Sequence, residues 1–460
     1  MKSSAFVILI FAICSSVNSG QLKRVWMQDH CTSGLCQGVT ISRDDYVILS
    51  NTPITKQIIL TFVNSTIAKI PHLMFDTFPD LQILRMDNCS VETFEKPQFE
   101  GASNLMGLFL ANNQIRDIPK NIFLGADNLN TLSLAGNQLR HLQNQSFNAL
   151  KELKSLDLSH NKLENLPPGV FSPMRKLMEL NLSNNQLTAM PERIFEKTPN
   201  LTKVHLSYNK FLKFESEYFK NHPKLSLLDI SGNPLVDTTI NFDVLDTLLA
   251  NDCELHKLTI YGYVKEVELR NNSLQDIPNF PNAANVTVLD LSINPIASLE
   301  ATSLRRYIGL AKLNFSRTKI HDFPEGVFKK QTKLKVLDIS NNSLYNLKVS
   351  VFDNLKALQY FYFHQNNWNC DFLQLLMNSY VKRREIVFAE DDLEPDKVDD
   401  YVDGVACWYE SSRTSKKCSE DGESVLELAI IRNDIKAFVE TVDKKFVKIF
   451  RLLDEIKSKV

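Results

Sequence analysis

The chain has 460 residues, of which 43% are hydrophobic, an ordinary share for a folded protein. Its 52 Lys and Arg residues nearly balance 54 Asp and Glu residues, so the formal net charge is -2. This balance excludes the basic footprint of a nucleic-acid-binding protein, and we expect no nucleic-acid partner.

Residues 1–20 are typical of a secretory signal peptide. A lone Lys2 precedes an apolar run from Ala5 to Cys14, and small or polar residues lead to Gly20. The run is too short to span a bilayer, and its small-residue end suits cleavage. No later stretch reaches 18 apolar residues. We therefore expect a secreted, extracellular protein with no membrane anchor.

Residues 21–56 lack the repeat that follows and are interpreted as an N-terminal cap. They contain Cys31 and Cys36, five positions apart, and a strand-like run at 46–49. A solenoid needs such an atypical unit, because its first coil would otherwise expose apolar surface. The two cysteines lie close together in a segment with little other core, so we predict a disulfide between them.

The middle of the chain repeats with a period of 24 residues. Between Leu129 and Lys176, two successive units both give L-x-x-L-x-L-x-x-N-x-L, then a Leu at position 14 and a Phe at position 19. This is the leucine-rich repeat, and about fourteen units occupy residues 57–368. One coil cannot bury its own core, so coils must stack. The expected fold is an α/β leucine-rich-repeat solenoid (horseshoe) with N- and C-terminal caps, followed by a C-terminal coiled-coil helix.

The period gives each position a role. Leu132 and Leu134 flank an outward Ser133, which is the alternation of a strand with one buried face. The amide of Asn137 ends the strand and should bond the backbone of the buried turn. The recurring Phe should form a buried spine on the convex side. It is missing between 225 and 284, where the steps shorten to 20, 19 and 22 residues, so we expect the convex wall to thin there.

Four residues replace the ladder asparagine, and two of them are Cys89 and Cys253. Cysteine is a usual substitute at this position. The two lie eight coils apart, too far to bridge, so we interpret both as buried single thiols and not as a redox or metal pair.

The outward strand positions form the concave face of the horseshoe. Their polar members include the five candidate site residues Asp157, His205, Asp229, Glu268 and Asp290. One interpretation is that these acids are ordinary solvated residues of the sheet with no binding role, and we favour it. The other is a site for a basic protein partner.

Nine Asn-x-Ser/Thr sequons suit a secreted chain, at Asn64, Asn88, Asn144, Asn181, Asn200, Asn271, Asn285, Asn314 and Asn341. Asn181 and Asn314 fall on concave strands. A glycan at either would obstruct a ligand along that face.

Residues 369–419 are interpreted as a C-terminal cap. A helix follows Cys370, then an acidic loop, Cys407 and Cys418. Caps of this type commonly carry Cys-x-Cys, but Phe372 replaces the second cysteine. We predict that Cys370 pairs with Cys407, which has apolar neighbours. A Cys370–Cys418 bond that leaves Cys407 as the linker stays open.

Removing the signal peptide leaves seven cysteines, an odd number. In an oxidising compartment this implies a free thiol or a bond to another chain. Cys418 lies in a polar stretch ten residues before the seam described next. We predict that it forms the interchain disulfide.

Residues 424–460 carry one apolar seam at helical spacing, formed by Leu428, Ile431, Ile435, Phe438, Val442, Phe446, Ile449, Leu453 and Ile456. Charges occupy the other faces. The seam predicts a coiled coil with another chain. The alternative, a helix that folds back onto the C-terminal cap, stays open.

Together, the signal peptide, the Asn-ladder repeats, the cap that opens Asn-Asn-Trp-Asn-Cys370 and the C-terminal seam resemble the secreted mosquito leucine-rich-repeat immune protein family. The resemblance implies a protein of the haemolymph that pairs through a disulfide with a related leucine-rich-repeat chain. It also implies that the pair holds a complement-like thioester protein.

Motifs of catalysis are missing from the sequence. The nine histidines are scattered, and there is no His-Glu-x-x-His, Gly-x-Ser-x-Gly, Gly-rich phosphate loop or Cys-x2-Cys. We therefore predict a protein that is not an enzyme and binds no cofactor or metal. The main interpretation is a binding scaffold of innate immunity. The rival is a soluble receptor or adhesion ectodomain that binds a protein ligand on its concave face.

Overall fold

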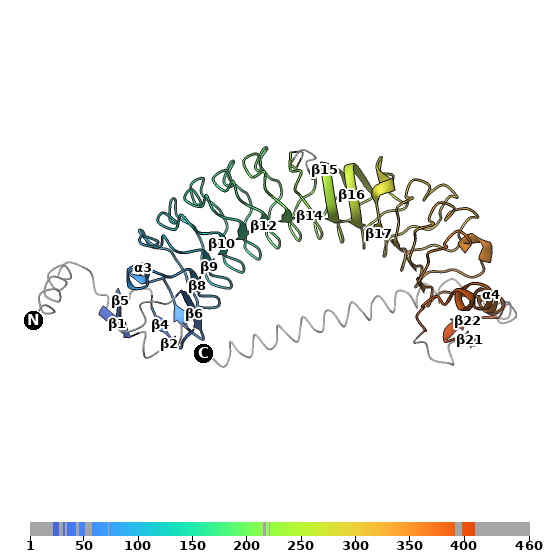
Figure 1. Ribbon diagram of the computed structural model, residues 1–460, viewed down its shortest axis with the longest axis horizontal. Helices are drawn as coiled ribbons and strands as arrows, with labels where there is room; N and C mark the ends of the chain where they lie inside the picture. Colours follow the sequence, from blue (N-terminus) through green and yellow to red (C-terminus); the bar gives the residue numbers. More distant parts are fainter. Residues whose placement is uncertain are drawn as a thin grey trace, which may run out of the picture.

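The computed structural model forms an arched solenoid with short strands along its inner side and turns along its outer side (Figure 1). It describes residues 22–26, 31–32, 35–42, 46–50, 58–71, 73–214, 218–219, 221–391 and 398–409. The signal peptide, Cys418 and the seam residues lie outside this part of the chain. Within it, one sheet of 16 strands runs the length of the arch.

At the N-terminal end, a small unit extends the sheet past the first repeat. Strand β2 (Cys31–Thr32) pairs antiparallel with β3 (Leu35–Gln37), and β3 pairs parallel with the first repeat strand, β6 (Ile59–Val63). Two further parallel pairs join β1 (Leu22–Trp26) to β5 (Tyr46–Ser50) and β4 (Thr40–Ile41) to β7 (Thr66–Ile67).

Cys36 in this unit is buried and disulfide-bonded. Its register partner across the β2–β3 pair is Cys31, the partner that the sequence predicts. The bond between these two cysteines stays a prediction.

After β2 and β3, the remaining strands of the sheet are all parallel, in chain order, with one for each repeat. From β6 onward they are β8 (Ile83–Arg85), β9 (Gly107–Phe109), β10 (Thr131–Ser133), β11 (Ser155–Asp157), β12 (Glu179–Asn181), β13 (Lys203–His205), β14 (Leu227–Asp229), β15 (Asp237–Leu249), β16 (Lys257–Glu268), β17 (Val288–Asp290), β18 (Lys312–Asn314), β19 (Val336–Asp338) and β20 (Tyr360–Tyr362). Short helical turns occur at α3 (Met74–Thr77), η2 (Ala283–Asn285) and η3 (Val349–Phe352). The predicted leucine-rich-repeat solenoid is thus confirmed.

The ladder asparagines satisfy the buried backbone between coils. The amide nitrogen of Asn137 donates to the carbonyls of Leu110 and Leu134, at 2.8 and 3.0 Å, and its Oδ1 accepts from the N–H of Ile115 at 3.0 Å. Each asparagine therefore ties its own turn to the preceding one. These bonds form where unpaired polar groups would be costly.

The two cysteines at ladder positions are buried free thiols. The Cys89 sulfur lies 3.4 Å from the carbonyl of Asp87 and 3.7 Å from that of Phe62, so it makes weak versions of the asparagine contacts. Burial raises the pKa of Cys89 to about 11 and that of Cys253 to about 12. Both therefore stay protonated, and a protonated thiol is a poor nucleophile and metal ligand.

One left-handed residue precedes every ladder position. Its φ lies between 46° and 67° at Asn64, Asn88, Asn112, Gly136, His160, Asn184, Tyr208, Gly232, Asp252, Asn271, Ile293, Arg317, Asn341 and Gln365. Asn and Gly tolerate this conformation best, which explains their frequency there.

The convex phenylalanines form the expected buried spine. Ring centroids of Phe171 and Phe195 lie 6.0 Å apart with planes 12° from parallel, and those of Phe195 and Phe219 lie 5.1 Å apart. All three side chains are at most 1% exposed. The recurring aromatic is therefore core and not a binding surface.

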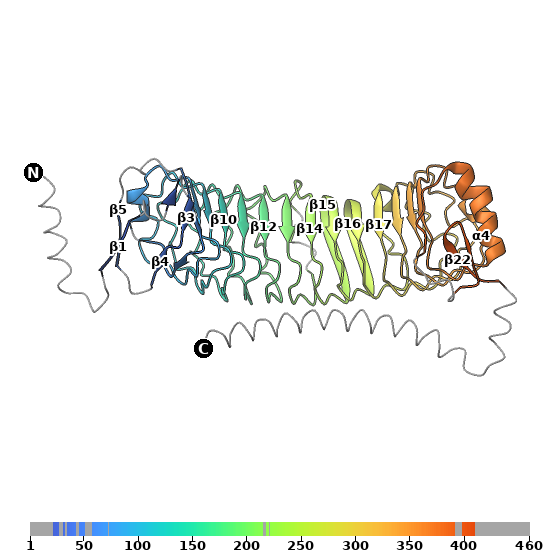
Figure 2. The ribbon, with the colours of Figure 1, turned by 90° about the horizontal axis from the view of Figure 1, so that it is seen from below.

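Where the spine is missing, an extended ribbon replaces it. Strands β15 and β16 have 13 and 12 residues and run well beyond their neighbours over one flank (Figure 2). Ile240, Phe242 and Ile260 on this ribbon are buried, so the wall does not thin as expected. A residue in an extended strand advances the chain by about 3.3 Å, which is more than a residue in a helical turn does. Repeats of 20 or 19 residues can therefore complete a coil that elsewhere takes 24 residues.

A glycine permits the close contact within this ribbon. The register between β15 and β16 shifts at Asn241/Val244. Opposite this bulge, Gly262 has a φ of +121°, and a Cβ there would lie 1.9 Å from the carbonyl oxygen of Phe242. Only glycine fits this position.

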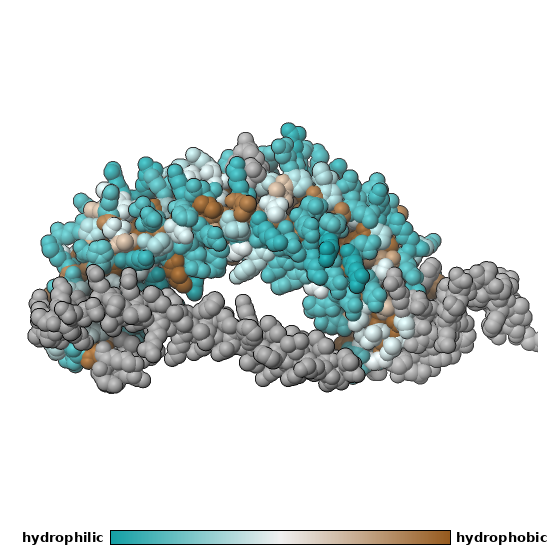
Figure 3. Space-filling view, turned by 180° about the vertical axis from the view of Figure 1, so that it is seen from behind, coloured by the Kyte–Doolittle hydropathy of each residue, from teal (hydrophilic) through white to brown (hydrophobic). Residues whose placement is uncertain are grey.

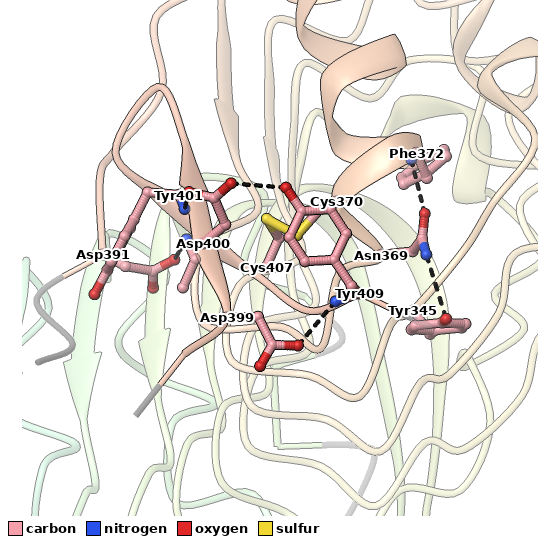
Figure 4. Close-up of a disulfide and its surroundings, with 11 residues drawn as sticks. Tyr345, Asn369, Cys370, Phe372, Asp391, Asp399, Asp400, Tyr401, Cys407 and Tyr409 are labelled. Atoms are coloured by element: carbon pink, nitrogen blue, oxygen red, sulfur yellow. Dashed lines mark hydrogen bonds between the residues drawn. A yellow bond between two sulfur atoms is a disulfide. The ribbon is translucent and has the colours of Figure 1, made fainter. Parts of the chain in front are cut away.

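The C-terminal end is covered by α4 (Cys370–Leu376), its continuation through η4 (Met377–Val381) and η5 (Lys382–Arg384), and the hairpin β21 (Asp400–Val402) and β22 (Val405–Cys407). Asn369 caps the helix, because its Oδ1 accepts from the N–H of Phe372 at 3.0 Å (Figure 4).

The predicted disulfide joins Cys370 to Cys407, whose Cα atoms lie 5.0 Å apart (Figure 4). It fixes the start of α4 to the hairpin. Phe372, which stands where related caps carry a second cysteine, is buried, and its ring lies 5.4 Å from that of Trp368. Aromatic packing thus replaces the second crosslink.

Candidate protein-binding face

The concave sheet brings the five candidate residues into one row. Asp157, His205, Asp229, Glu268 and Asp290 are each the last residue of their strand. The parallel register aligns these positions across neighbouring strands, with Asn181, Leu249 and Asn314 in the same row. These residues therefore share one row of the sheet, and a binding role for them stays a prediction.

His205 and Asp229 form a pair on this row, with 3.7 Å between His205 Nδ1 and Asp229 Oδ2. Burial alone would raise the pKa of Asp229, but hydrogen bonds from His205, Ser207 and Ser231 outweigh it and lower that pKa. The histidine side chain is 36% exposed. The pair therefore lies on an open sheet, where hydrogen bonds stabilise the Asp229 carboxylate.

The aspartates of the row have a local structural task that the sequence interpretation missed. Oδ1 of Asp157 accepts from the N–H of Ser159 at 2.9 Å, and Oδ1 of Asp290 accepts from the N–H of Ser292 at 2.8 Å. These are Asx turns, which hold the chain where it leaves the strand. The repeated Asx-x-Ser in the sequence is the signal for them. These turns favour the interpretation that the acids have no binding role over the interpretation that they bind a basic protein partner.

Other acids on the sheet also have partners. Glu268 Oε2 accepts from Asn251 Nδ2 at 3.1 Å, and Asp246 lies 2.5 Å from the ammonium of Lys265. Leu249 interrupts the row between Asp229 and Glu268. The acids from Asp229 to Asp290 therefore form no continuous surface and are partly paired.

Apolar side chains gather instead at the N-terminal end of the concave sheet. Ile59, Ile83 and Gly107 share one register on β6, β8 and β9, and Ile59 is 46% exposed. Beside them the guanidinium of Arg85 lies 3.9 Å from the ring centre of Phe109. We call Ile59, Ile83 and Phe109 the apolar strip. From the sequence we singled out the polar residues of the concave face and therefore missed this strip.

Hydrophilic residues cover most of the face seen in Figure 3, where hydrophobic residues occur in small groups. Small groups of this kind are usual on a protein surface, and larger ones mark interaction sites.

Two sequons lie in the concave row. Oδ1 of Asn181 accepts from the N–H of Ser183 at 3.0 Å. The Nδ2 of Asn314, the atom that would carry a glycan, donates to Asp290 Oδ2 at 3.1 Å. A glycan at Asn314 would replace one of the two hydrogens on this Nδ2 atom. Occupancy of the nine sequons stays a prediction.

In the part of the chain that the structure describes, no three His, Cys, Asp or Glu side chains come together as they would to hold a metal ion. Among the same residues, every helix is too short or too polar to cross a bilayer.

Two family patterns match the chain. The one described as leucine rich repeat matches residues 79–139, 127–187 and 175–235, and the one described as BspA type leucine rich repeat region matches 251–371. The chain is 34% identical over 95 residues to leucine-rich repeats and immunoglobulin-like domains protein 2 of Homo sapiens. That match covers 20% of this chain and 9% of that protein, so the chain spans under a tenth of its length.

Solved structures share the fold over most of the chain. A crystal structure of the LRIM1/APL1C complex superimposes with a TM-score of 0.59 at 21% identity, and covers 92% of this chain and 79% of that one. The APL1 leucine-rich repeat domain gives a TM-score of 0.60 at 22% identity, over 84% of this chain and 99% of that one. At such identities the similarity shows the fold.

Proposed function

We propose, from the premise that this chain is a leucine-rich-repeat protein, that it is a secreted, non-enzymatic binding scaffold of innate immunity. In this proposal it pairs with a related leucine-rich-repeat chain through the seam at 428–456 and a disulfide at Cys418. By the family resemblance, the pair holds a complement-like thioester protein against pathogens, in the haemolymph.

The observation that carries the pairing is the Cys370–Cys407 bond in the C-terminal cap. It occupies the two cysteines of the C-terminal cap, which could otherwise have bonded Cys418. Cys89 and Cys253 are buried at ladder positions. Cys418 therefore has none of these four as a partner within the chain, which favours a bond to another chain.

Fold similarity supports the same proposal. One solved structure of this fold is of the LRIM1/APL1C complex, and its similarity extends over 92% of this chain. Its name describes two different chains assembled together. Pairing of this chain with a related partner would be an assembly of the same kind.

The test is a non-reducing gel of the protein secreted from cells that also express related leucine-rich-repeat chains. Wild-type protein should run as a disulfide-linked dimer that reducing agent dissolves, and Cys418→Ser should remove the band. Cys253→Ser is the control, because that thiol is buried and should leave the dimer unchanged. A dimer band that survives Cys418→Ser rejects Cys418 as the link.

The apolar strip favours one second candidate, a soluble receptor or adhesion ectodomain that binds a protein ligand on its concave face. Ile59 and Phe109 offer apolar contact area there. If this candidate is correct, the secreted protein is a monomer, and Ile59→Asp abolishes capture of the ligand while Cys418→Ser does not.

A further inference from the structure

The extended ribbon has an incomplete edge. Residues 257–261 of β16 pair with 237–241 of β15 on one side. On the other side, β17 pairs only with Glu266, Val267 and Glu268. Among the described residues, no backbone hydrogen bond joins 257–263 to the next repeat, and only the side chain of Asn282 donates to the Gly262 carbonyl, at 3.0 Å.

A groove lies along this edge. It has a volume of about 410 Å³, between Lys257, Leu258 and Thr259 on one wall and residues 273–279 of the next repeat on the other. The next repeat returns to irregular backbone here, because its 22-residue step does not continue the ribbon. Alternate N–H and C=O groups of a strand with one neighbour point away from that neighbour, so those of β16 face this groove.

The side chains along the edge suit a further strand. Tyr261 and Tyr263 are 51% and 52% exposed on the outer face of β16. Such aromatic residues stabilise cross-strand pairs with β-branched or aromatic partners. Lys257 has no ion pair among the described residues, and in the existing ladder its register partner is Asp237. An added strand that begins with an acid would place a second carboxylate beside it.

We propose that this groove is a peptide-binding site in which an extended segment of a partner polypeptide adds to β16 as a third, parallel strand. The segment has an acidic residue opposite Lys257 and β-branched or aromatic residues opposite Thr259 and Tyr261. Main-chain hydrogen bonds hold it, and the alternate side chains select it. The site is on the flank, away from the concave face and independent of the Cys418 pairing.

The sequence of β15 supplies a probe, because it already pairs with the other edge of β16. A fluorescein-labelled peptide that copies residues 237–243 with Asn241→Val, so that a β-branched residue lies opposite Tyr261, is titrated with the full secreted protein and followed by fluorescence anisotropy. The protein carries Asn285→Gln, which removes the exposed sequon that follows the far wall of the groove in the sequence, so that a glycan there does not affect the measurement. Amide hydrogen exchange of 257–263 is measured with and without peptide.

We expect saturable binding and slower exchange at 257–263. The same peptide with Thr239→Pro should bind about tenfold more weakly, since the N–H of residue 239 faces β16 in the proposed strand and proline removes that ladder donor. Tyr261→Lys in the protein should weaken binding about fivefold through the lost cross-strand pair. Tyr360→Lys, at a tyrosine that is 42% exposed on the concave sheet, is the matched control and should bind as wild type.

Three results would overturn the proposal. They are the lack of saturable binding up to millimolar peptide, equal binding of the proline peptide, and protection that falls outside 257–263. Equal loss of binding in Tyr261→Lys and Tyr360→Lys would also place the peptide elsewhere. None of these results bears on the dimer band, so failure here is distinct from failure of the proposed function.

Discussion

At the scale of single residues, the left-handed position before each ladder residue shows how backbone conformation restricts the sequence. Asn or Gly fills it in most coils, but Ile293 occupies it with a φ of 56°. A β-branched residue is strained in this region, at a cost of about 1–2 kcal/mol, because its Cβ crowds the following carbonyl.

We predict that Ile293→Asn raises the free energy of unfolding by about 1 kcal/mol, since Asn tolerates this conformation. Urea unfolding of the two proteins measures the change. Asn184→Ile, which introduces the strain where it is now missing, should lower stability by a similar amount. If Ile293→Asn does not raise stability and Asn184→Ile does not lower it, backbone strain does not limit this position.

The phenylalanine spine gives a second residue-scale prediction. Phe171 is fully buried, so Phe171→Ala should cost about 3–5 kcal/mol of unfolding free energy, the range for emptying a buried aromatic site. Leu124→Ala is the control, because that side chain is 57% exposed and its loss should change stability by less than about 0.5 kcal/mol. Similar effects of the two changes would contradict the core role of the spine.

His222 packs at the end of the spine and makes stability depend on pH. Its ring lies 5.9 Å from that of Phe219, its Nε2 lies 3.1 Å from the carbonyl oxygen of Phe195, and its buried Nδ1 has no hydrogen-bond partner among the residues that the structure describes. Burial lowers the pKa of His222, and the carbonyls around it only partly oppose this. The unfolded chain, with a His pKa of about 6.5, binds a proton that the native state resists. Stability should therefore fall as pH drops below about 6.5.

Melting temperatures between pH 7.5 and 5 test this, with His222→Gln as the comparison. Gln331 occupies the position in its own repeat that His222 occupies in an earlier one. Its Nε2 donates to the carbonyl of Leu304 at 2.8 Å, and a glutamine at 222 could donate to the carbonyl of Phe195 in the same way. The variant should lose less stability than wild type over this range. Parallel pH curves for the two proteins would show that His222 is not the group responsible.

At the scale of elements, the β15–β16 ribbon depends on one glycine. We predict that Gly262→Ala costs more than about 2 kcal/mol, because its Cβ would clash with the Phe242 carbonyl in addition to the strain at φ +121°. Gly326→Ala isolates the clash: its φ is +87°, but nothing lies within 4 Å of the added Cβ. Urea unfolding should show the larger loss at Gly262, and equal losses would contradict the close contact.

Much of the architecture could be predicted from the sequence, since leucine and asparagine spacing dictates the coil, the ladder and the spine. The β15–β16 ribbon was not predicted, although Thr238, Ile240 and Phe242 alternate with polar residues as in a strand with one buried face. Absence of the convex Phe was interpreted as a thinner wall, because a missing residue does not reveal what replaces it. The strand spacing also indicates which candidate residues share a row, but the Asx turns of the aspartates in that row depend on backbone geometry that residue spacing does not show.

At the scale of the whole molecule, each coil touches only its neighbours, so stability should be lost from the ends inward. Removing the Cys370–Cys407 crosslink, which spans 37 residues, should cost about 4 kcal/mol by the chain-entropy model. We predict that Cys370→Ser with Cys407→Ser accelerates amide exchange in β19 and β20 while β10 to β12 keep their rates. Uniform acceleration along the arch would show instead that the solenoid unfolds as one unit.

The left-handed position has a consequence for how the surface of this protein can change over generations. Asn64, Asn88, Asn271 and Asn341 occupy it and are also sequons, because Ser or Thr stands two residues later. Asn112 and Asn184 meet the same backbone demand but are followed by Gln114 and Gln186. A single replacement of either glutamine by serine would create a new glycan attachment point at the same edge. The turn that builds the coil thus supplies a row of ready acceptor asparagines, and carbohydrate can be gained, lost or moved coil by coil while the fold is inherited unchanged.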